Sequence, residues 1–346
     1  MSNKPDVSKM NGNPHDGNPE EEMLAEKWAK DTLAKYPAFA SMVKGKEYVL
    51  DIFTDGAAIP ANDILQVSSC LLGMTRMGKT NALAVFLEAL TRVNASYSVL
   101  DFEGDIYTIA DIFPQVKVLK INPKWPAEKI RKLARWVILS RGQLILKFDQ
   151  SSSAESKRFF ELIFLGQLYD TADELYDKGL AVPHLHVVDE APFFFPNTTK
   201  MRSTERHQSE LVNLGDLVAR TGQKRGLGIM VATTRPSGLN TDLLSQMKVR
   251  ALMRVIEETD IKRYRTSLRL LENRETKVGK IIRTVISLGV GECVYAPNKG
   301  KPFTARFKLR ESRHISKTPG IEDYWRLDSV KKEPSEMLSP EEMVHG

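Results

Sequence analysis

Apolar runs and amphipathic runs alternate along most of this chain. Apolar runs of about four to eight residues predict buried strands, and longer segments with apolar positions at helical spacing predict helices. Strands that alternate with helices are typical of a mostly parallel sheet covered on both faces, an α/β fold. The predicted strands are 48–53, 67–72, 97–101, 116–120, 143–148, 185–189, 228–233, 292–296 and 303–309, and the predicted helices are 21–36, 79–93, 127–138, 154–175, 204–220 and 257–275.

The same pattern divides the chain into four parts. Residues 1–20 are rich in Ser, Asn, Pro, Gly, Asp and Glu, so we expect them to be disordered. Residues 21–60 predict a small appendage of one helix and one strand, and residues 61–312 hold the alternating α/β core. Residues 313–346 are mixed in charge and predict a partly ordered C-terminal arm.

Composition excludes several classes of protein. Of the 346 residues, 42% are hydrophobic, which is enough for a substantial core. No run of about 18 apolar residues is present and the N-terminus is polar, so we expect a soluble cytoplasmic protein without a membrane segment. The two cysteines, Cys70 and Cys293, support neither a disulfide framework nor a cysteine zinc site, and both are predicted core residues.

One short motif predicts nucleotide chemistry. The segment Gly73–Thr80 reads Gly-Met-Thr-Arg-Met-Gly-Lys-Thr and lies between a predicted strand and a predicted helix, as a phosphate-binding loop does. Its backbone N–H groups would surround phosphate oxygens, Lys79 would reach the β- and γ-phosphates, and Thr80 would hold Mg²⁺. A plain glycine-rich turn is the alternative. The predicted ligands are ATP and Mg²⁺, and the predicted binding residues are Gly73, Met74, Thr75, Arg76, Met77, Gly78, Lys79, Thr80, Asn81 and Asp101.

Two carboxylates end the apolar strand 185–189. In a phosphate-loop ATPase, Asp189 at this position would support the Mg²⁺ shell, and Glu190 would polarise the attacking water. Along the chain, at least the strand 143–148 lies between the loop and these carboxylates. This spacing favours ATPases with a catalytic Glu beside the metal-binding Asp over GTPase switches and small-molecule kinases.

Other polar residues lie at predicted strand ends. Asp101, followed by Glu103 and Asp105, is expected to join the water or Mg²⁺ network, with a plain turn as the alternative. Thr234 follows another apolar strand, where a side chain can sense the γ-phosphate. His184 and His186 alternate into strand 185–189, and we expect packed or hydrogen-bonded imidazoles rather than metal ligands.

The net charge of +6 is concentrated in one segment. Residues 248–283 contain eleven basic and five acidic side chains, a surplus equal to that of the whole chain. Such a segment favours a nucleic-acid backbone as a partner. Solvated helix faces are the alternative interpretation for each of these residues.

Taken together in their order along the chain, these motifs resemble those of the HerA/FtsK superfamily of ring-forming DNA translocases. The resemblance to HerA is the closer one. The resemblance covers about residues 45–312. Two departures from the family pattern stand out: Thr234 occupies a position where the family usually has Gln, and only about 60 residues precede the first core strand, too few for the family's N-terminal barrel. The matching segments are Gly73–Thr80, Asp101–Asp105, Val187–Ala191, Val218–Gly226, Gly228–Ser237, Leu244–Gln246 and Leu288–Glu292.

The resemblance implies a RecA-like core that assembles as a homohexamer around double-stranded DNA, with ATP between subunits. A basic residue from a neighbouring subunit would then complete each site. The implied catalytic residues are Lys79, Glu190, Thr234 and, in trans, Arg220, with Lys224 and Arg225 behind it. Possible pore residues are Lys200, Arg202 and Arg206.

Three functions remain open on the sequence. The first is an ATP-driven double-stranded DNA translocase, a short form reminiscent of viral, plasmid or defence motors, acting in genome packaging, DNA transfer or end processing with a possible capsid, transfer or nuclease partner. A viral origin would place it in the host cytoplasm or the virion. The second is an ATP-gated assembly subunit that docks an effector such as a nuclease without moving DNA. The third, a protein-remodelling ATPase, is disfavoured by the basic segment 248–283.

Overall fold

The computed structural model describes residues 43–44, 47–149, 151–197, 207–269 and 275–314. By its internal contacts the chain divides into two units, residues 1–312 and 313–346. Only Arg313 and His314 of the second unit are described. The predicted disordered segment 1–20, the predicted helix 21–36 and nearly all of the predicted arm therefore lie outside the described residues.

A nine-stranded sheet forms the centre of the first unit, in the order β12-β11-β10-β4-β9-β8-β5-β7-β6. The strands from β10 to β6 are parallel, whereas β11 and β12 pair antiparallel at one edge. The predicted α/β fold with a mostly parallel sheet is confirmed. The strands are β4 (Ser69–Leu72), β5 (Ser96–Asp101), β6 (Lys117–Ile121), β7 (Gln143–Phe148), β8 (His184–Val188), β9 (Leu227–Thr233), β10 (Val249–Leu252), β11 (Glu292–Ala296) and β12 (Phe303–Arg306).

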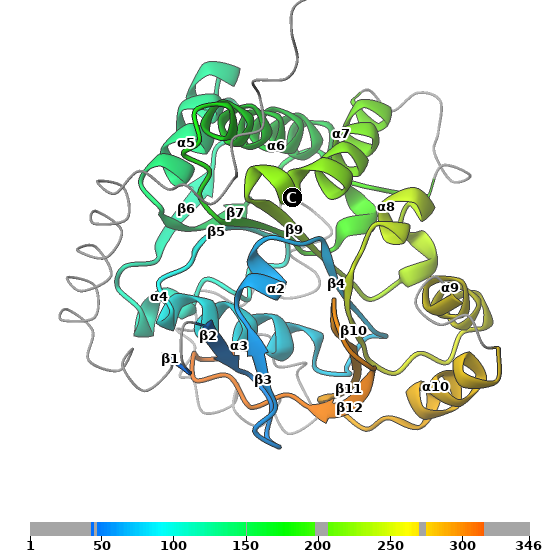
Figure 1. Ribbon diagram of the computed structural model, residues 1–346. Coiled ribbons are helices and arrows are strands. Elements are labelled where there is room, and N and C mark those ends of the chain that lie inside the picture. Colours follow the sequence, from blue (N-terminus) through cyan, green and yellow to red (C-terminus); the bar gives the residue numbers. More distant parts are fainter. Residues whose placement is uncertain (1–42, 45–46, 150, 198–206, 270–274, 315–346) are drawn as a thin grey trace, which may run out of the picture. The chain divides into compact units, whose positions relative to one another are not determined.

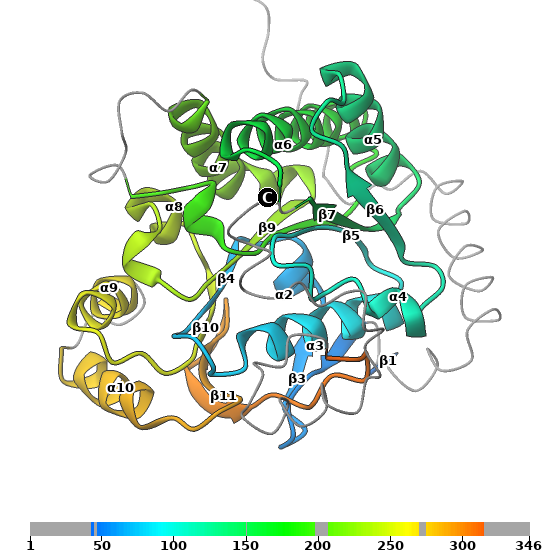
Figure 2. The ribbon, with the colours of Figure 1, turned by 180° about the vertical axis from the view of Figure 1, so that it is seen from behind.

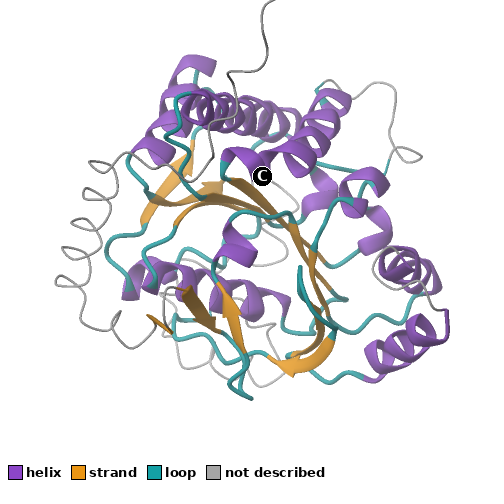
Figure 3. Ribbon diagram, viewed as in Figure 1, coloured by secondary structure: helices purple, strands orange, loops and turns teal. Residues whose placement is uncertain are grey.

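Helices cover both faces of the sheet (Figures 1 and 3). One face carries α5 (Ala127–Leu139), α6 (Ala154–Asp177) and α7 (Gln208–Thr221). The other carries α3 (Lys79–Arg92) and a small antiparallel sheet of β1 (Val43–Lys44), β2 (Glu47–Asp51) and β3 (Ala58–Pro60), as the view from behind also shows (Figure 2). The remaining elements are the helices α2 (Asn62–Leu65), α4 (Ile109–Ile112), α8 (Thr241–Ser245), α9 (Glu258–Arg269) and α10 (Glu275–Ser287), and the 3-10 turns η3 (Ala191–Phe193), η5 (Gly222–Arg225) and η6 (Pro236–Gly238).

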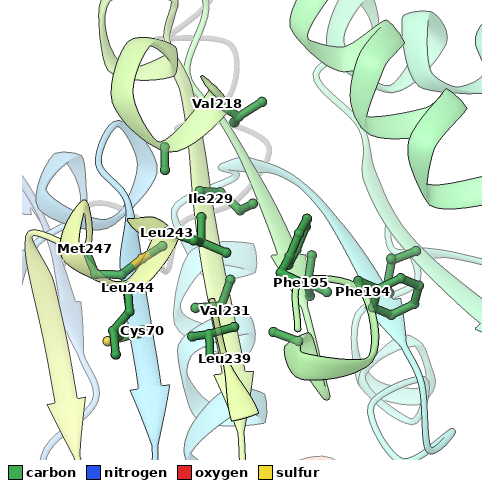
Figure 4. Close-up of a cluster of buried hydrophobic side chains, with 14 of the residues drawn as sticks. Cys70, Phe194, Phe195, Val218, Ile229, Val231, Leu239, Leu243, Leu244 and Met247 are labelled. Atoms are coloured by element: carbon green, nitrogen blue, oxygen red, sulfur yellow. The ribbon is translucent and has the colours of Figure 1, made fainter. Parts of the chain in front are cut away.

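The apolar strands fill two cores, one on each face of the sheet. In β9, Ile229 and Val231 pack into the core beneath α6 and α7, whereas Met230 and Ala232 pack into the core around α3. Side chains buried on both faces explain why these strands read as continuous apolar runs. Figure 4 shows part of the first core, where residues of β9 meet residues of α8 and the pair Phe194 and Phe195.

Two elements of the basic segment differ from the sequence prediction. The predicted helix 257–275 corresponds to α9, and α10 is a further helix that the prediction did not contain. Strand β10 was also missed because its four residues include Arg250, which resembles a surface position. Arg250 is only 1% exposed, and its Nε donates to Ser267 Oγ on α9 at 2.7 Å. The expectation of a surface charge is therefore wrong for Arg250.

A chain of buried polar side chains crosses β5 and β8. His184 Nδ1 lies 2.7 Å from Ser96 Oγ, and His184 Nε2 lies 3.0 Å from Ser98 Oγ. His186 continues the chain, with Nδ1 2.8 Å from Ser98 Oγ and Nε2 3.0 Å from Glu161 Oε1. Both imidazoles are buried and hydrogen-bonded, as expected from the sequence, and they link β5 and β8 to Glu161 of α6.

His184 should make the fold sensitive to acid. Burial, and to a lesser extent the neighbouring His186, lowers the pKa of His184 from 6.5 to about 3. Below pH 6.5 the unfolded chain binds a proton here that the folded chain does not bind until about pH 3, so stability falls as the pH drops through this window. The contribution is up to about 1.4 kcal/mol per pH unit.

Urea unfolding at several pH values between about pH 7 and pH 4 would measure this effect. We expect the free energy of unfolding of His184→Gln to fall less steeply with decreasing pH than that of the wild type. An identical slope for the two proteins would show that His184 is not the acid-sensitive group.

Candidate nucleotide-binding site

The loop between β4 and α3 has the backbone of an anion-binding loop. Gly78 adopts a left-handed conformation with φ of 88°, and a Cβ on Gly73 would lie 2.6 Å from Met253 Cβ, so glycine is required at both positions. The N–H groups in the first turn of α3 have no partner within the helix and point toward the loop. Together with the positive end of the helix, they form a site for phosphate oxygens.

Lys79 lies between the two carboxylates that follow β8. Its Nζ is 2.5 Å from Asp189 Oδ1 and 3.3 Å from Glu190 Oε1, and the Lys79 side chain is only 6% exposed. Burial by itself would lower the pKa of Lys79, but the charges of Asp189 and then Glu190 outweigh burial and raise it. Lys79 therefore stays charged, and the structure brings together three residues that the sequence analysis predicted to act together.

Glu190 and Thr234 face each other across the carboxyl edge of the sheet. Thr234 Oγ1 lies 3.3 Å from Glu190 Oε1, in a position to donate a hydrogen bond. This contact arises because β9 lies between β4 and β8 in the sheet, so the strand that separates the loop from the carboxylates in space is β9 and not 143–148. Glu190 has a left-handed backbone with φ of 48°, an unfavourable conformation for a non-glycine residue, which often marks a functional position.

Asp101 holds a turn. Both of its carboxylate oxygens accept backbone hydrogen bonds of 3.0 to 3.2 Å, and the side chain is buried. Burial raises the pKa of Asp101 to about 6, although these hydrogen bonds oppose the increase. The structure therefore supports the plain-turn interpretation, and a role in the water or Mg²⁺ network stays a prediction. The donors are the N–H groups of Gly104, Asp105, Ile106 and Tyr107.

The turn presents Glu103 near the two carboxylates that follow β8. Burial and then the charge of Asp189 raise the pKa of Glu103, while Lys79 opposes the increase. The sequence analysis noted Glu103 in an acidic strand end but did not include it among the site residues. Glu103 is a carboxylate near the end of a predicted strand, but so are its neighbours Asp101 and Asp105. The sequence therefore did not indicate which of the three lies near the site.

Asn81 contacts a segment far along the chain. Its Nδ2 donates to the Lys308 carbonyl at 2.8 Å, and its Oδ1 accepts from the Arg310 N–H at 3.0 Å. The side chain thus faces residues 308–310, which leaves the backbone N–H of Asn81 as the group available to a phosphate. The predicted side-chain role in nucleotide binding receives no support from these contacts.

Residues 307–312 form a strap along α3. The buried carboxylate of Glu88 accepts the N–H groups of Glu311 and Ser312 at 3.0 and 2.9 Å, and Ser312 Oγ at 2.6 Å. Arg310 donates to the Asp105 carbonyl and to Thr108 Oγ1, which ties the strap to the turn around Asp101. The strap was not predicted, because polar residues 202 to 229 positions apart give no local signal.

Comparisons with known proteins find relatives of part of this chain. No family model matches the chain. The DNA double-strand break repair helicase HerA of Saccharolobus solfataricus is 27% identical over 165 residues, which are 47% of this chain and 29% of that protein. HerA of Pyrococcus furiosus is 28% identical over 197 residues, 56% of this chain and 32% of its own length, so the matches span about a third of these relatives.

A similar fold occurs in VirB4 of Thermoanaerobacter pseudethanolicus, with a TM-score of 0.50 and 10% identity, over 78% of this chain and 98% of that one. The HerA relatives are similar to this chain in sequence over about half of its length, and Lys79 of the loop contacts the two carboxylates after β8. These findings support a HerA/FtsK-type P-loop ATPase. The family expectation from the sequence is confirmed, and the expected enzyme class, an ATPase, is confirmed with it.

The basic residues predicted to act in trans lie on the surface of this HerA/FtsK-type ATPase. Arg220, at the end of α7, is 54% exposed and pairs with Asp216 one turn earlier at 2.9 Å. Lys224 is exposed, whereas Arg225 pairs with Asp173 and lies over the ring of Tyr169 at 5.0 Å. Arg225 therefore has a structural role within its own subunit, and the trans role of Arg220 stays a prediction.

Other expectations for this ATPase have mixed outcomes. The predicted pore residues Lys200, Arg202 and Arg206 lie outside the described residues. Cys70 and Cys293 are both buried, as predicted. Among the helices that the structure describes, none is long and apolar enough to cross a membrane. Five basic residues of the segment 248–283 are exposed on α9 and α10, namely Lys262, Arg265, Lys277, Lys280 and Arg283.

Proposed function

We propose that this chain hydrolyses ATP at the loop Gly73–Thr80 and uses the reaction to translocate double-stranded DNA as a ring motor, in genome packaging, DNA transfer or end processing. The observation that carries the proposal is the convergence of Lys79, Asp189, Glu190 and Thr234 at one edge of the sheet. Two further observations support DNA as the substrate in this proposal: the similarity to the HerA relatives and the exposed basic side chains of α9 and α10.

The hydrolytic step follows from these positions. The loop N–H groups and Lys79 bind the triphosphate, so the Lys79 ammonium exchanges its contact with Asp189 for the β- and γ-phosphates. Glu190, 20% exposed, orients a water and accepts its proton as the water oxygen attacks the γ-phosphorus and the bond to the bridging oxygen of ADP breaks. Thr234 orients the Glu190 carboxylate and detects the departure of the γ-phosphate.

The residues present fit Mg²⁺ as the accompanying ion. The Thr80 hydroxyl at the start of α3 and the Asp189 carboxylate are hard oxygen ligands, and Mg²⁺ bound with a nucleotide needs only one or two carboxylates besides the phosphates. The described residues contain no cluster of three or more His, Cys, Asp or Glu side chains that could hold a metal ion. Mg²⁺ would neutralise charge that develops on the phosphate oxygens.

Two assays on the purified protein test the proposal. Phosphate release from ATP should increase when duplex DNA is added, and an ATP-dependent displacement of the third strand from a DNA triplex should accompany it. Hydrolysis that ignores nucleic acid would contradict the proposal. DNA binding and ATP hydrolysis without triplex displacement would instead identify the ATP-gated assembly subunit, and negative-stain images with duplex DNA would show whether a ring forms.

A further inference from the structure

We propose that a polar pocket beside α9 binds a backbone phosphate of the nucleic acid, and that its occupancy is linked to the nucleotide site through the turn after β9. This inference rests on the proposed function, because it names where the DNA contacts this chain. The pocket has a volume of about 400 Å³. It is lined by Asn197, Ser237, Thr259, Lys262, Arg263 and Thr266.

The lining has the chemistry of a phosphate site. Among the described residues, the lining combines two cations with three hydroxyls and one amide, and includes no carboxylate. Lys262 is exposed and lines the pocket, so its charge can reach a ligand there. The carboxylate of Asp260 on α9 is 6% exposed, accepts the backbone N–H of Ser237, and acts on the charge of Arg263. Cations and hydroxyls of this kind bind phosphates rather than base edges, so the contact would not depend on sequence.

The pocket is built on the segments that carry Glu190 and Thr234. The chain after β8 and the chain after β9 pair as a short antiparallel ribbon at Pro196 and Leu239. Two hydrogen bonds extend the ribbon, from Asn197 N–H to the Gly238 carbonyl at 2.8 Å and from Asn240 N–H to the Phe195 carbonyl at 2.9 Å. The segments beyond Glu190 and beyond Thr234 therefore move as one piece, and Asn197 and Ser237 of that piece line the pocket.

Asp260 attaches α9 to the same piece. Its Oδ1 accepts the Ser237 N–H at 2.7 Å, and Ser237 lies three residues after Thr234. A shift of Thr234 on loss of the γ-phosphate would reach Lys262 and Thr266 through this bond. By thermodynamic linkage, a phosphate bound in the pocket must in turn bias the nucleotide site. Figures 1 and 2 show α9 between α8 and α10 along one side of the sheet.

The salt dependence of DNA binding tests the pocket. In Lys262→Ala, the slope of the logarithm of the binding constant against the logarithm of salt concentration should decrease in magnitude by about 1, equally on duplexes of unrelated sequence. Lys262→Arg keeps the charge and should keep the wild-type slope, which separates a lost contact from a damaged fold. The matched control is Lys124→Ala before α5, also an exposed lysine but outside both the pocket and the basic segment 248–283, and it should behave as wild type.

Several outcomes would overturn the pocket. One is a wild-type slope for Lys262→Ala in a protein whose wild-type form binds DNA and is stimulated by it, in which case the proposed function stands and only this inference fails. An equal loss in Lys124→Ala would show that the contact is not specific to the pocket. Inorganic phosphate that raises the melting temperature of the wild type but not of Lys262→Ala, and leaves DNA binding unchanged, would assign the pocket to free phosphate. A wild type that does not bind DNA would refute the proposed function itself.

Substitutions of Asp260, which acts as a positioning residue, test the link between the pocket and the nucleotide site. In Asp260→Ala the ratio of hydrolysis rates with and without saturating DNA should fall toward one, because the bond to Ser237 is lost. Asp260→Asn keeps an oxygen acceptor and should restore the ratio. A wild-type ratio in Asp260→Ala would show that this bond does not carry the coupling.

Discussion

Glu190→Gln is expected to bind ATP and to hydrolyse it about 10² to 10⁴ times more slowly than the wild type, the usual contribution of a general base. The amide cannot take the proton of the attacking water. Its oxygen can still accept the Thr234 hydroxyl, which lies 3.3 Å from the carboxylate, so the local structure should persist. Single-turnover phosphate release gives the rate, and a fluorescent ATP analogue gives the affinity.

A matched carboxylate controls for the change of charge. Glu155→Gln, exposed in the first turn of α6, should hydrolyse ATP at the wild-type rate. If Glu190→Gln stayed within about tenfold of wild type, below the range expected of a base, another group would have to activate the water. Glu103 would then be the next candidate, because it lies near Lys79 and both carboxylates after β8.

Lys79→Ala is expected to cause two separate losses. The first is weaker ATP binding by about 10- to 150-fold, the value of a hydrogen bond to a charged group of about 1.5 to 3 kcal/mol. The second is lower stability of the nucleotide-free protein by about 3 to 5 kcal/mol, because Asp189 would keep a buried charge without its partner. The side chains of Lys79 and Asp189 are 6% and 5% exposed, so water can compensate only a little.

A double substitution separates these effects. Lys79→Ala combined with Asp189→Asn removes the unpaired charge, so it should regain most of the lost stability and none of the ATP affinity. Urea unfolding without nucleotide and equilibrium titration with an ATP analogue measure the two quantities. Wild-type stability of the single Lys79→Ala variant would mean that the contact with Asp189 does not stabilise the empty site.

Local patterns predicted the parts of the site that are continuous in the chain. The loop Gly73–Thr80 and the strand before Asp189 were recognisable because glycine spacing and a buried apolar run are short-range signals. The contact between Thr234 and Glu190 was not predictable from spacing, since it depends on β9 inserting between β4 and β8. The order of strands in a sheet is decided by packing of the whole core.

Charged residues were the least predictable. From the sequence, Arg250 is interpreted as part of a basic surface. It is buried because β10 pairs with a strand on each side, and its guanidinium donates a hydrogen bond to Ser267. Arg310 and Glu88 read as ordinary surface charges, although they bind the backbone of distant segments. A charged side chain carries no local signal that distinguishes a solvated position from a buried partner far along the chain.

The strap 307–312 sets a limit on how the chain can be shortened. Glu88 is 2% exposed, and its carboxylate receives donors from Glu311 and Ser312 alone among the described residues. A fragment that ended before residue 307 would retain every nucleotide motif, yet would leave this carboxylate, on the helix that begins at Lys79, without these donors. Deletion experiments on the C-terminal arm should therefore cut after Ser312, because an earlier cut would damage ATP binding and be mistaken for an effect of the arm.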